Sequence, residues 1–239
     1  MTAPVRSAIL FWRAIDDSGS TAAVTPDCFR RQIETIATAG IPVVKLQDIR
    51  SANQSIALTF DGAYRTYAEI ALPILESYGY PSTLFVSSGH CKRGGRYLKW
   101  DELRTIAQQG GVEIGAQGVT LSDWSAKGSM QLAAEMDECA EEISQYTGTM
   151  ALALAYPFGR SDRRIQWLAS QRFRLAVGRT PRFAGADSEL FSLPRIDARY
   201  FRQLFWLHHL HGDAGAHWVS KCEFFNALPA LRSIIRVHD

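Results

Sequence analysis

Short apolar runs alternate with amphipathic segments along most of the chain. The apolar runs are nearly continuous, as expected of parallel strands buried on both faces. We expect strands over residues 8–12, 42–46, 55–60, 82–86, 112–115, 151–155 and 174–177. Helical patterns separate them, and this order is typical of βα units around a parallel sheet. Seven strands favour a barrel over a small open sheet.

Residues that begin and end helices support this division. Thr25 can cap a helix that has Pro26 at its first position, and Gly40 can end it. The longest helix is predicted over residues 129–147, with an apolar stripe along one face and Gly148 directly after it. Apolar stripes of this kind face the core and contain no candidate catalytic residues.

Length and composition indicate one globular unit. The chain has 239 residues, of which 46% are hydrophobic and 11% aromatic, enough for one well-buried core. We therefore expect a single domain over residues 1–239. Lys and Arg number 26 against 24 for Asp and Glu, a formal charge of +2, so we expect no nucleic-acid partner.

The length of the amino-terminal apolar run indicates in which cellular compartment to expect the protein. Residues 8–12 are too few for a signal-peptide core or a membrane span, so we expect no membrane partner and a cytoplasmic protein. The cysteines lie far apart without a Cys-x-x-Cys pair, which predicts reduced and mostly buried thiols at Cys28, Cys91, Cys139 and Cys222.

One apolar run leads directly into an acidic turn. Residues 57–65 read Ala-Leu-Thr-Phe-Asp-Gly-Ala-Tyr-Arg, and barrel enzymes place catalytic groups where such strands end. The segment resembles the first motif of the polysaccharide deacetylase family (NodB homology, carbohydrate esterase family 4), normally Thr-Phe-Asp-Asp-Gly. Further similar segments occur in family order at residues 71–86, 98–103, 112–115, 155–159 and 193–196. The resemblance covers roughly residues 8–200 and implies an α/β fold, the distorted (β/α)7-type barrel of the glycoside hydrolase/deacetylase superfamily.

The resemblance also implies an inventory of catalytic residues. In the family one Asp and two His hold a divalent metal, a neighbouring Asp is the general base, and metal-bound water attacks an N-acetyl carbonyl. Asp61 matches the base, but Gly62 stands where the metal-binding Asp belongs. The two His positions fall at Gln117 and Leu121. All three ligands are missing, so we expect no metal and no other cofactor.

Candidate site residues remain around this position. Asp61 could be either a helix cap or a base with a raised pKa. Arg13 and Gln117 are the candidates to assist it in catalysis. Trp12 replaces a His found in relatives with a Tyr-His-Arg signature, whereas Arg13 is kept. Aromatic faces suit sugar rings, so the candidate substrate-binding residues are Trp12, Tyr64, Arg65, Tyr156 and Phe158.

A cluster of histidines lies near the carboxyl end, at His208, His209 and His211. No acidic residue or Cys completes a recognised ligand spacing, so a solvated helix end is the simpler interpretation. Leu207, His208 and His209 loosely match a late Leu-x-His motif from which the family takes a catalytic acid.

Three functions are compatible with this pattern. The first is a deacetylase-like protein that has lost metal-dependent N-deacetylation and binds a saccharide or related metabolite in the ancestral groove. The second is a metal-independent hydrolase or other acid/base enzyme that uses Asp61. The third is a structural or accessory subunit, favoured if Trp12 and Leu121 fill the groove. Whether the chain is an enzyme stays open, as does a protein partner or a homo-oligomer.

Overall fold

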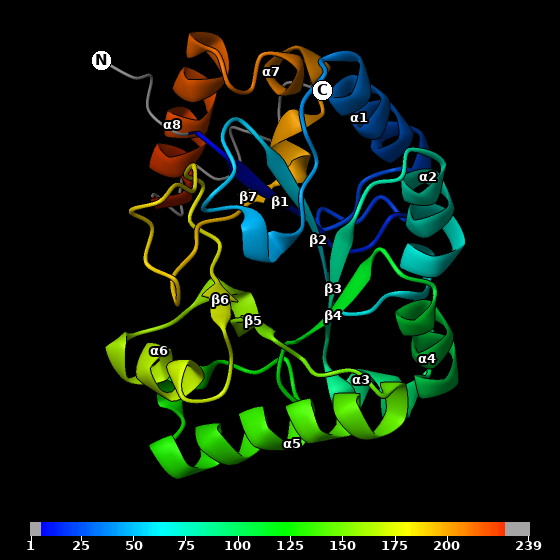
Figure 1. The fold of residues 1–239 in the computed structure, drawn as a ribbon, viewed down its shortest axis with the longest axis vertical. Coiled ribbons are helices and arrows are strands. Elements are labelled where there is room, and N and C mark those ends of the chain that lie inside the picture. Colours follow the sequence, from blue (N-terminus) through cyan, green and yellow to red (C-terminus); the bar gives the residue numbers. More distant parts are fainter. Residues whose placement is uncertain (1–5, 228–239) are drawn as a thin grey trace.

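A curled parallel sheet forms the centre of the molecule (Figure 1). The computed structural model describes residues 6–227. Seven strands pair in the order β6-β5-β4-β3-β2-β1-β7. Their bounds are β1 Ala8–Trp12, β2 Ile56–Asp61, β3 Ser82–Val86, β4 Val112–Ala116, β5 Ala153–Ala155, β6 Leu175–Val177 and β7 Ile196–Asp197. Val177 at the end of β6 forms a parallel bridge with Leu193, just before β7, and this contact brings the two ends of the sheet together.

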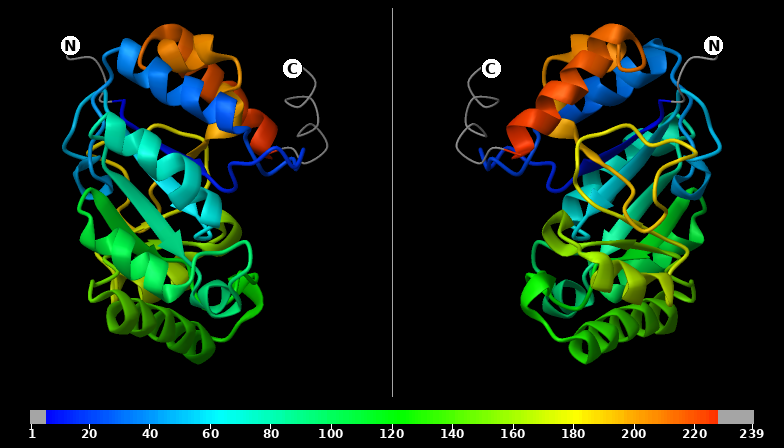
Figure 2. Two further views of the ribbon diagram at one scale, coloured as in Figure 1. Left: turned by 90° about the vertical axis from the view of Figure 1, so that its right-hand side faces the viewer. Right: turned by 90° about the vertical axis from the view of Figure 1, so that its left-hand side faces the viewer.

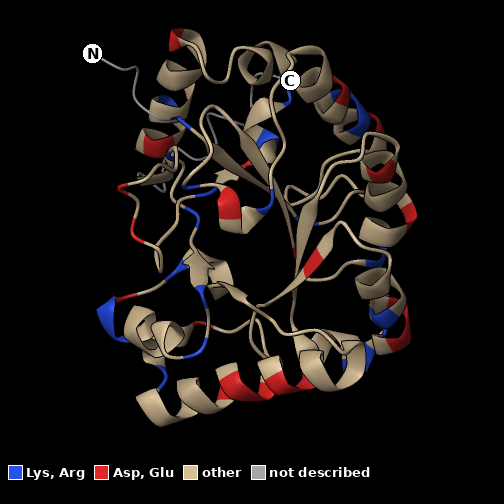
Figure 3. Cartoon of the chain, viewed as in Figure 1, with Lys and Arg blue, Asp and Glu red and all other residues tan. Residues whose placement is uncertain are grey.

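Helices surround the outside of the sheet (Figures 1 and 2). They are α1 Pro26–Thr38, α2 Leu72–Ser77, α3 Ser88–Arg93, α4 Trp100–Gln108, α5 Ser129–Thr147, α6 Arg163–Ser170, α7 Leu204–His208 and α8 Asp213–Ala227. The predicted helix ends are confirmed: the Thr25 side chain accepts a hydrogen bond from the Cys28 amide, and Gly148 ends α5 in the left-handed conformation. Basic and acidic residues are mixed over this outer layer (Figure 3).

Side chains that point alternately to the two faces of the strands form two separate apolar clusters. Leu10 and Trp12 of β1 belong to the outer cluster between sheet and helices, whereas Ile9 belongs to a smaller cluster inside the curl. In β2, Leu58 and Phe60 point outward and Ala57 inward. Since successive side chains of a strand face opposite sides, the odd-numbered residues of β1 and β2 point inside.

The predicted fold class is confirmed, and six of the seven predicted strands form close to their expected bounds. The strand predicted over residues 42–46 is wrong. Val43 makes a single bridge with Ile56, and β3 is the partner of β2 from Leu58 onward, so no edge of β2 is left for a longer pairing. The seventh strand is β7 instead, which pairs with β1 through two residues. It is too short to show the apolar pattern by which a strand is predicted from sequence.

All four cysteines are free, and Cys91, Cys139 and Cys222 are buried, as predicted. Within residues 6–227, none of the helices combines the length and the apolar character needed to cross a bilayer.

Gly115 of β4 provides a test of packing inside the curl. A Cβ at this position would stand 2.5 Å from Cδ1 of Phe85, so Gly115→Ala should lower the free energy of unfolding by about 1–3 kcal/mol. Gly178→Ala is the matched control, because its nearest neighbour, the Gly159 carbonyl oxygen, is 3.6 Å away. Urea unfolding measures both variants. Equal stability of the two would contradict the packing described here.

Candidate functional site

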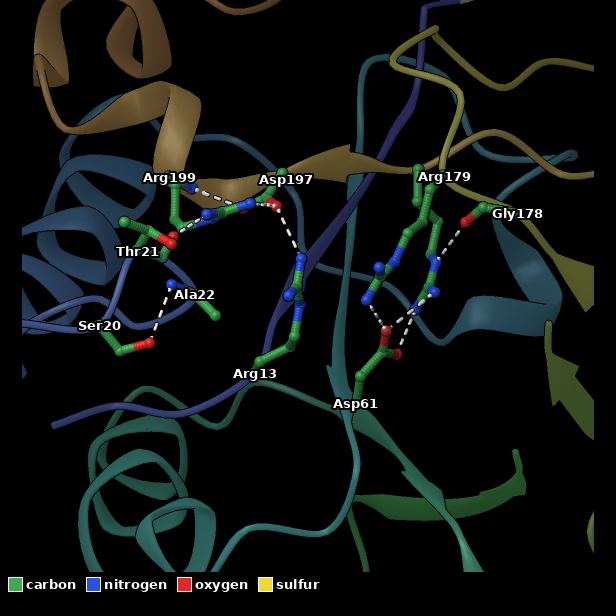
Figure 4. Close-up of polar contacts among 10 residues, drawn as sticks. Arg13, Ser20, Thr21, Ala22, Asp61, Gly178, Arg179, Asp197 and Arg199 are labelled. Atoms are coloured by element: carbon green, nitrogen blue, oxygen red, sulfur yellow. Dashed lines mark hydrogen bonds and ion pairs between the residues drawn. The ribbon is translucent and has the colours of Figure 1, made fainter. Parts of the chain in front are cut away.

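A group of charged side chains lies at the carboxyl ends of β1, β2, β6 and β7 (Figure 4). Asp61 ends β2, Asp197 ends β7, and Arg13 follows β1 directly. Arg179 follows β6 by two residues, and Arg195 precedes β7. These are the strand ends at which barrel enzymes place their active sites, although the residues come from distant parts of the sequence.

A buried ion pair forms the base of this group. Arg195 is fully buried and donates from Nη1 to Oδ1 of Asp61 at 2.7 Å and from Nη2 to Oδ2 at 3.2 Å. Its Nε donates to the Gly178 carbonyl at 2.8 Å. Arg179 adds a third contact to the carboxylate, from Nη2 to Oδ2 at 3.2 Å. Both oxygens of Asp61 are therefore occupied by guanidinium groups.

These contacts determine the charge of Asp61. Burial by itself would raise the pKa of this carboxyl, but the charges of Arg195 and Arg179 outweigh burial, and the pKa is lowered. The alternatives of a raised pKa and of a helix cap are both wrong. The carboxylate is held ionised, and within residues 6–227 it caps no helix.

A second carboxylate lies beside the first. Asp197 accepts hydrogen bonds from the backbone and side chain of Arg199, including Nε to Oδ1 at 2.9 Å. Arg13 approaches the same carboxylate at 3.5 Å. Burial raises the pKa of Asp197, but the arginines outweigh burial and the pKa is lowered. Asp197 is thus a second ionised carboxylate shared between two arginines.

A groove of about 1360 Å³ opens beside the charged group. Phe11 and Arg179 form part of its floor, and Phe158 lies at its rim with half of its surface exposed. The remaining wall is mostly polar and includes Asp16, Ser20, Thr21, Asp123, Arg160, Asp197, Arg199, Tyr200 and Gln203.

Two of the predicted site residues, Arg13 and Phe158, line this groove. Asp61 lies beneath its floor, in contact with Arg179. Tyr64 and Arg65 lie elsewhere: the Tyr64 ring contacts the Tyr97 ring, and Arg65 pairs with Glu102. The predicted roles of these residues remain predictions, although the structure does not bring Tyr64 or Arg65 to the groove wall.

Trp12, Tyr156 and Gln117 require correction as groove residues. Trp12 points outward in β1, stacks on Phe60 and donates from its indole to Gln32, so it is part of the core. Tyr156 is likewise buried on the outer side, with its hydroxyl donating to the Phe191 carbonyl. Gln117 directly follows β4, is buried, and is absent from the groove lining. Strand alternation places Trp12 on the outer face, and Tyr156, directly after β5, continues the same alternation.

The most important site residues were missed as functional candidates. Arg195 lies in segment 193–196, which resembles the family, but it was not among the candidate site residues. Arg179, Asp197 and Arg199 carry no local signal. An arginine between Pro194 and Ile196, in an otherwise apolar run, was the available hint that a buried charge needed a partner.

The residues present do not fit the metal that the fold family implies. Gly62 offers no donor, has φ of +90°, and a Cβ there would stand 3.0 Å from the Tyr64 ring. Leu121 has no lone pair, and both oxygens of Asp61 already accept from arginine. Gln117 has a buried Oε1 without a partner within residues 6–227, but one amide oxygen is not a metal site. The described residues contain no group of three or more His, Cys, Asp or Glu suited to a metal ion.

The histidine cluster stands apart from the groove. His208 and His209 are exposed at the end of α7, and Nδ1 of His209 lies 2.9 Å from the Phe205 carbonyl. His211 faces the Phe183 ring. These residues do not line the groove, so the loose match of Leu207, His208 and His209 to a catalytic motif gains no support from their position.

Comparisons with known proteins agree on one family. The family model described as polysaccharide deacetylase matches residues 48–173. The chain is 21% identical over 205 residues to "Putative polysaccharide deacetylase YxkH" of Bacillus subtilis (strain 168), which covers 81% of this chain and 71% of that protein.

Solved structures show the same architecture. The deacetylase PplD of Streptococcus pyogenes, determined in complex with acetate, superposes with a TM-score of 0.74 at 23% identity and covers 82% of this chain and 93% of its own. IcaB from Ammonifex degensii gives a TM-score of 0.69 at 18% identity, covering 80% and 91%. At these identities the likeness establishes the fold.

Removing the charge of Asp61 should strongly destabilise the protein. Asp61→Asn leaves the fully buried Arg195 without its counter-charge, which should cost about 3–5 kcal/mol in the free energy of unfolding. Asp137→Asn is the control, because Asp137 pairs with Arg172 near the surface and should cost about 0–1 kcal/mol. Chemical denaturation at pH 7 compares them, and similar costs for both variants would refute a structural role for the buried pair.

The same pair should give the protein a specific acid sensitivity. Because the pKa of Asp61 is lowered on folding, the pair contributes its full stability above about pH 5, and that contribution falls as the pH drops below about 4. The stability difference between the natural protein and Asp61→Asn should therefore narrow at low pH. Denaturation series between pH 3 and pH 7 measure it, and a constant difference would count against the lowered pKa.

Proposed function

The chain belongs to the polysaccharide deacetylase family, and from that premise we propose that it binds a saccharide in its groove without performing metal-dependent N-deacetylation. The observation that carries the proposal is the state of Asp61. Both of its oxygens are held by Arg195 and Arg179 beneath a groove that remains open.

The donor set supports the loss of metal-dependent hydrolysis. A catalytic metal needs several lone-pair donors converging on one point. Here Gly62 and Leu121 supply none, and the left-handed backbone at Gly62 would strain an aspartate placed there. The charge beside Asp61 comes instead from guanidinium groups, which donate three hydrogen bonds to its two oxygens.

The groove supports saccharide binding. Sugar sites combine aromatic faces with polar side chains that hydrogen-bond to hydroxyl groups. Phe158 presents a half-exposed ring at the rim, while Ser20, Thr21 and Gln203 line the wall. The volume of about 1360 Å³ is large enough for more than one sugar ring.

The alternatives are less well supported. A general base needs a free lone pair and a pKa near the working pH, but Asp61 is 3% exposed and its pKa is lowered. A purely structural role was linked to a groove filled by Trp12 and Leu121. Trp12 points into the outer core instead, and neither residue lines the groove. A protein partner or homo-oligomer remains a prediction.

Purified protein incubated with zinc and with N-acetylglucosamine oligomers tests the proposal. We expect substoichiometric metal after dialysis, no release of acetate, and an increase in Tm with the oligomers. Stoichiometric zinc together with acetate release would overturn the loss of hydrolysis. An unchanged Tm across a panel of neutral and acidic saccharides would overturn saccharide binding.

A matched pair of variants locates the binding. Phe158→Ala removes a groove aromatic and should weaken saccharide binding about threefold to tenfold. Trp167→Ala removes an aromatic on α6 that is outside the groove and 62% exposed, against 50% for Phe158, and it should leave affinity unchanged.

A further inference from the structure

Positive charge exceeds negative charge at the floor of the groove. Four guanidinium groups, those of Arg13, Arg179, Arg195 and Arg199, share two carboxylates, those of Asp61 and Asp197. The arginine side chains are only 0–26% exposed, so solvent screens them poorly. The group therefore carries an excess of two positive charges in a largely dehydrated place.

The excess is located on Arg13 and Arg179. Arg195 and Arg199 each make paired contacts to a carboxylate, whereas Arg13 reaches Asp197 only at 3.5 Å. Arg179 makes a single 3.2 Å contact, and its buried Nε has no hydrogen-bond partner within residues 6–227. Burying a cation without full compensation is costly unless a ligand completes it.

Both of these incompletely satisfied cations lie near the ring of Phe11. The guanidinium carbons of Arg13 and Arg179 lie 5.9 Å and 4.9 Å from the centre of the Phe11 ring. All three residues line the groove. Burial and the charge of Arg179 both lower the pKa of Arg13, which is the effect expected of neighbouring like charges.

Carboxylates elsewhere in the groove restrict where an anion could bind. Asp16, Asp27 and Asp123 lie along the wall, and Arg160 pairs with Asp123. Arg31 and Arg202 also line the groove, but they are exposed, so solvent screens their charge. Arg13 and Arg179 are more buried, and each makes a single contact to a carboxylate.

We propose that the saccharide bound in the groove is acidic, and that its carboxylate or phosphate group binds between Arg13 and Arg179 above the Phe11 ring. The inference rests on the proposed saccharide-binding function and specifies its ligand. A planar guanidinium presents paired donors that match the oxygens of either anion. The neutral part of the sugar then extends toward Phe158.

Calorimetric titration of the full chain tests the proposal with oligosaccharides of equal length. One is a neutral N-acetylglucosamine oligomer and the other alternates N-acetylglucosamine with glucuronate. A sugar phosphate and inorganic phosphate distinguish the phosphate source from the carboxylate source. We expect the preferred acidic saccharide to bind at least tenfold more tightly than the neutral oligomer, with affinity falling as salt rises.

Variants at Arg13 assign the effect to the proposed site. Arg13→Gln should weaken acidic binding at least tenfold and weaken neutral binding far less, because a neutral oligomer has no anionic group for the guanidinium to bind. Arg13→Lys keeps the charge but loses the paired donors, and should give an intermediate affinity. Arg172→Gln is the control: Arg172 is 22% exposed, close to the 25% of Arg13, and lies outside the groove.

The outcomes separate this inference from the proposed function. Equal binding of acidic and neutral saccharides, or no effect of Arg13→Gln, overturns the inference while saccharide binding stands. Arg13-dependent binding of inorganic phosphate without binding of any saccharide supports the anion position and overturns the saccharide as its source.

Discussion

The buried pair of Asp61 and Arg195 is the interaction on which the rest of the site depends. Arg195 is fully buried in a protein interior that would otherwise exclude a charge, and it is stable there because Asp61 accepts two of its hydrogen bonds. The same arginine binds the carbonyl of Gly178, so it ties β2 to the segments around β6 and β7. Arg195 therefore both links these segments of the curled sheet and contributes to the charge of the site.

This pair also determines what chemistry Asp61 can perform. In the family that the chain belongs to, the corresponding position is that of a general base, which requires an available lone pair. Here Arg195 and Arg179 donate three hydrogen bonds to Asp61, and the pKa of Asp61 is lowered. Gly62 and Leu121 offer no side-chain donor to a metal, and the charged group beside Asp61 is rich in arginine.

The strand period explains why this surface contains the residues that it does. Side chains alternate between the inside of the curl and the helical layer, so Phe11 and Asp61 face inward while Trp12 and Phe60 face outward. Trp12 is conspicuous in the sequence because it follows an apolar run. Its position in the strand places its side chain in the core between sheet and helices. Phe11, one residue earlier, is the aromatic that contacts the guanidinium groups.

The sequence by itself determined the family and the barrel, because both depend on local patterns. Apolar runs, helix caps and the Thr59-Phe60-Asp61-Gly62 motif are all readable from neighbouring residues. Which carboxylates pair with which arginines was decided only in the tertiary structure. Asp61 lies 118 residues from Arg179 and 134 from Arg195, and no local pattern records a contact between strand ends so far apart in the sequence.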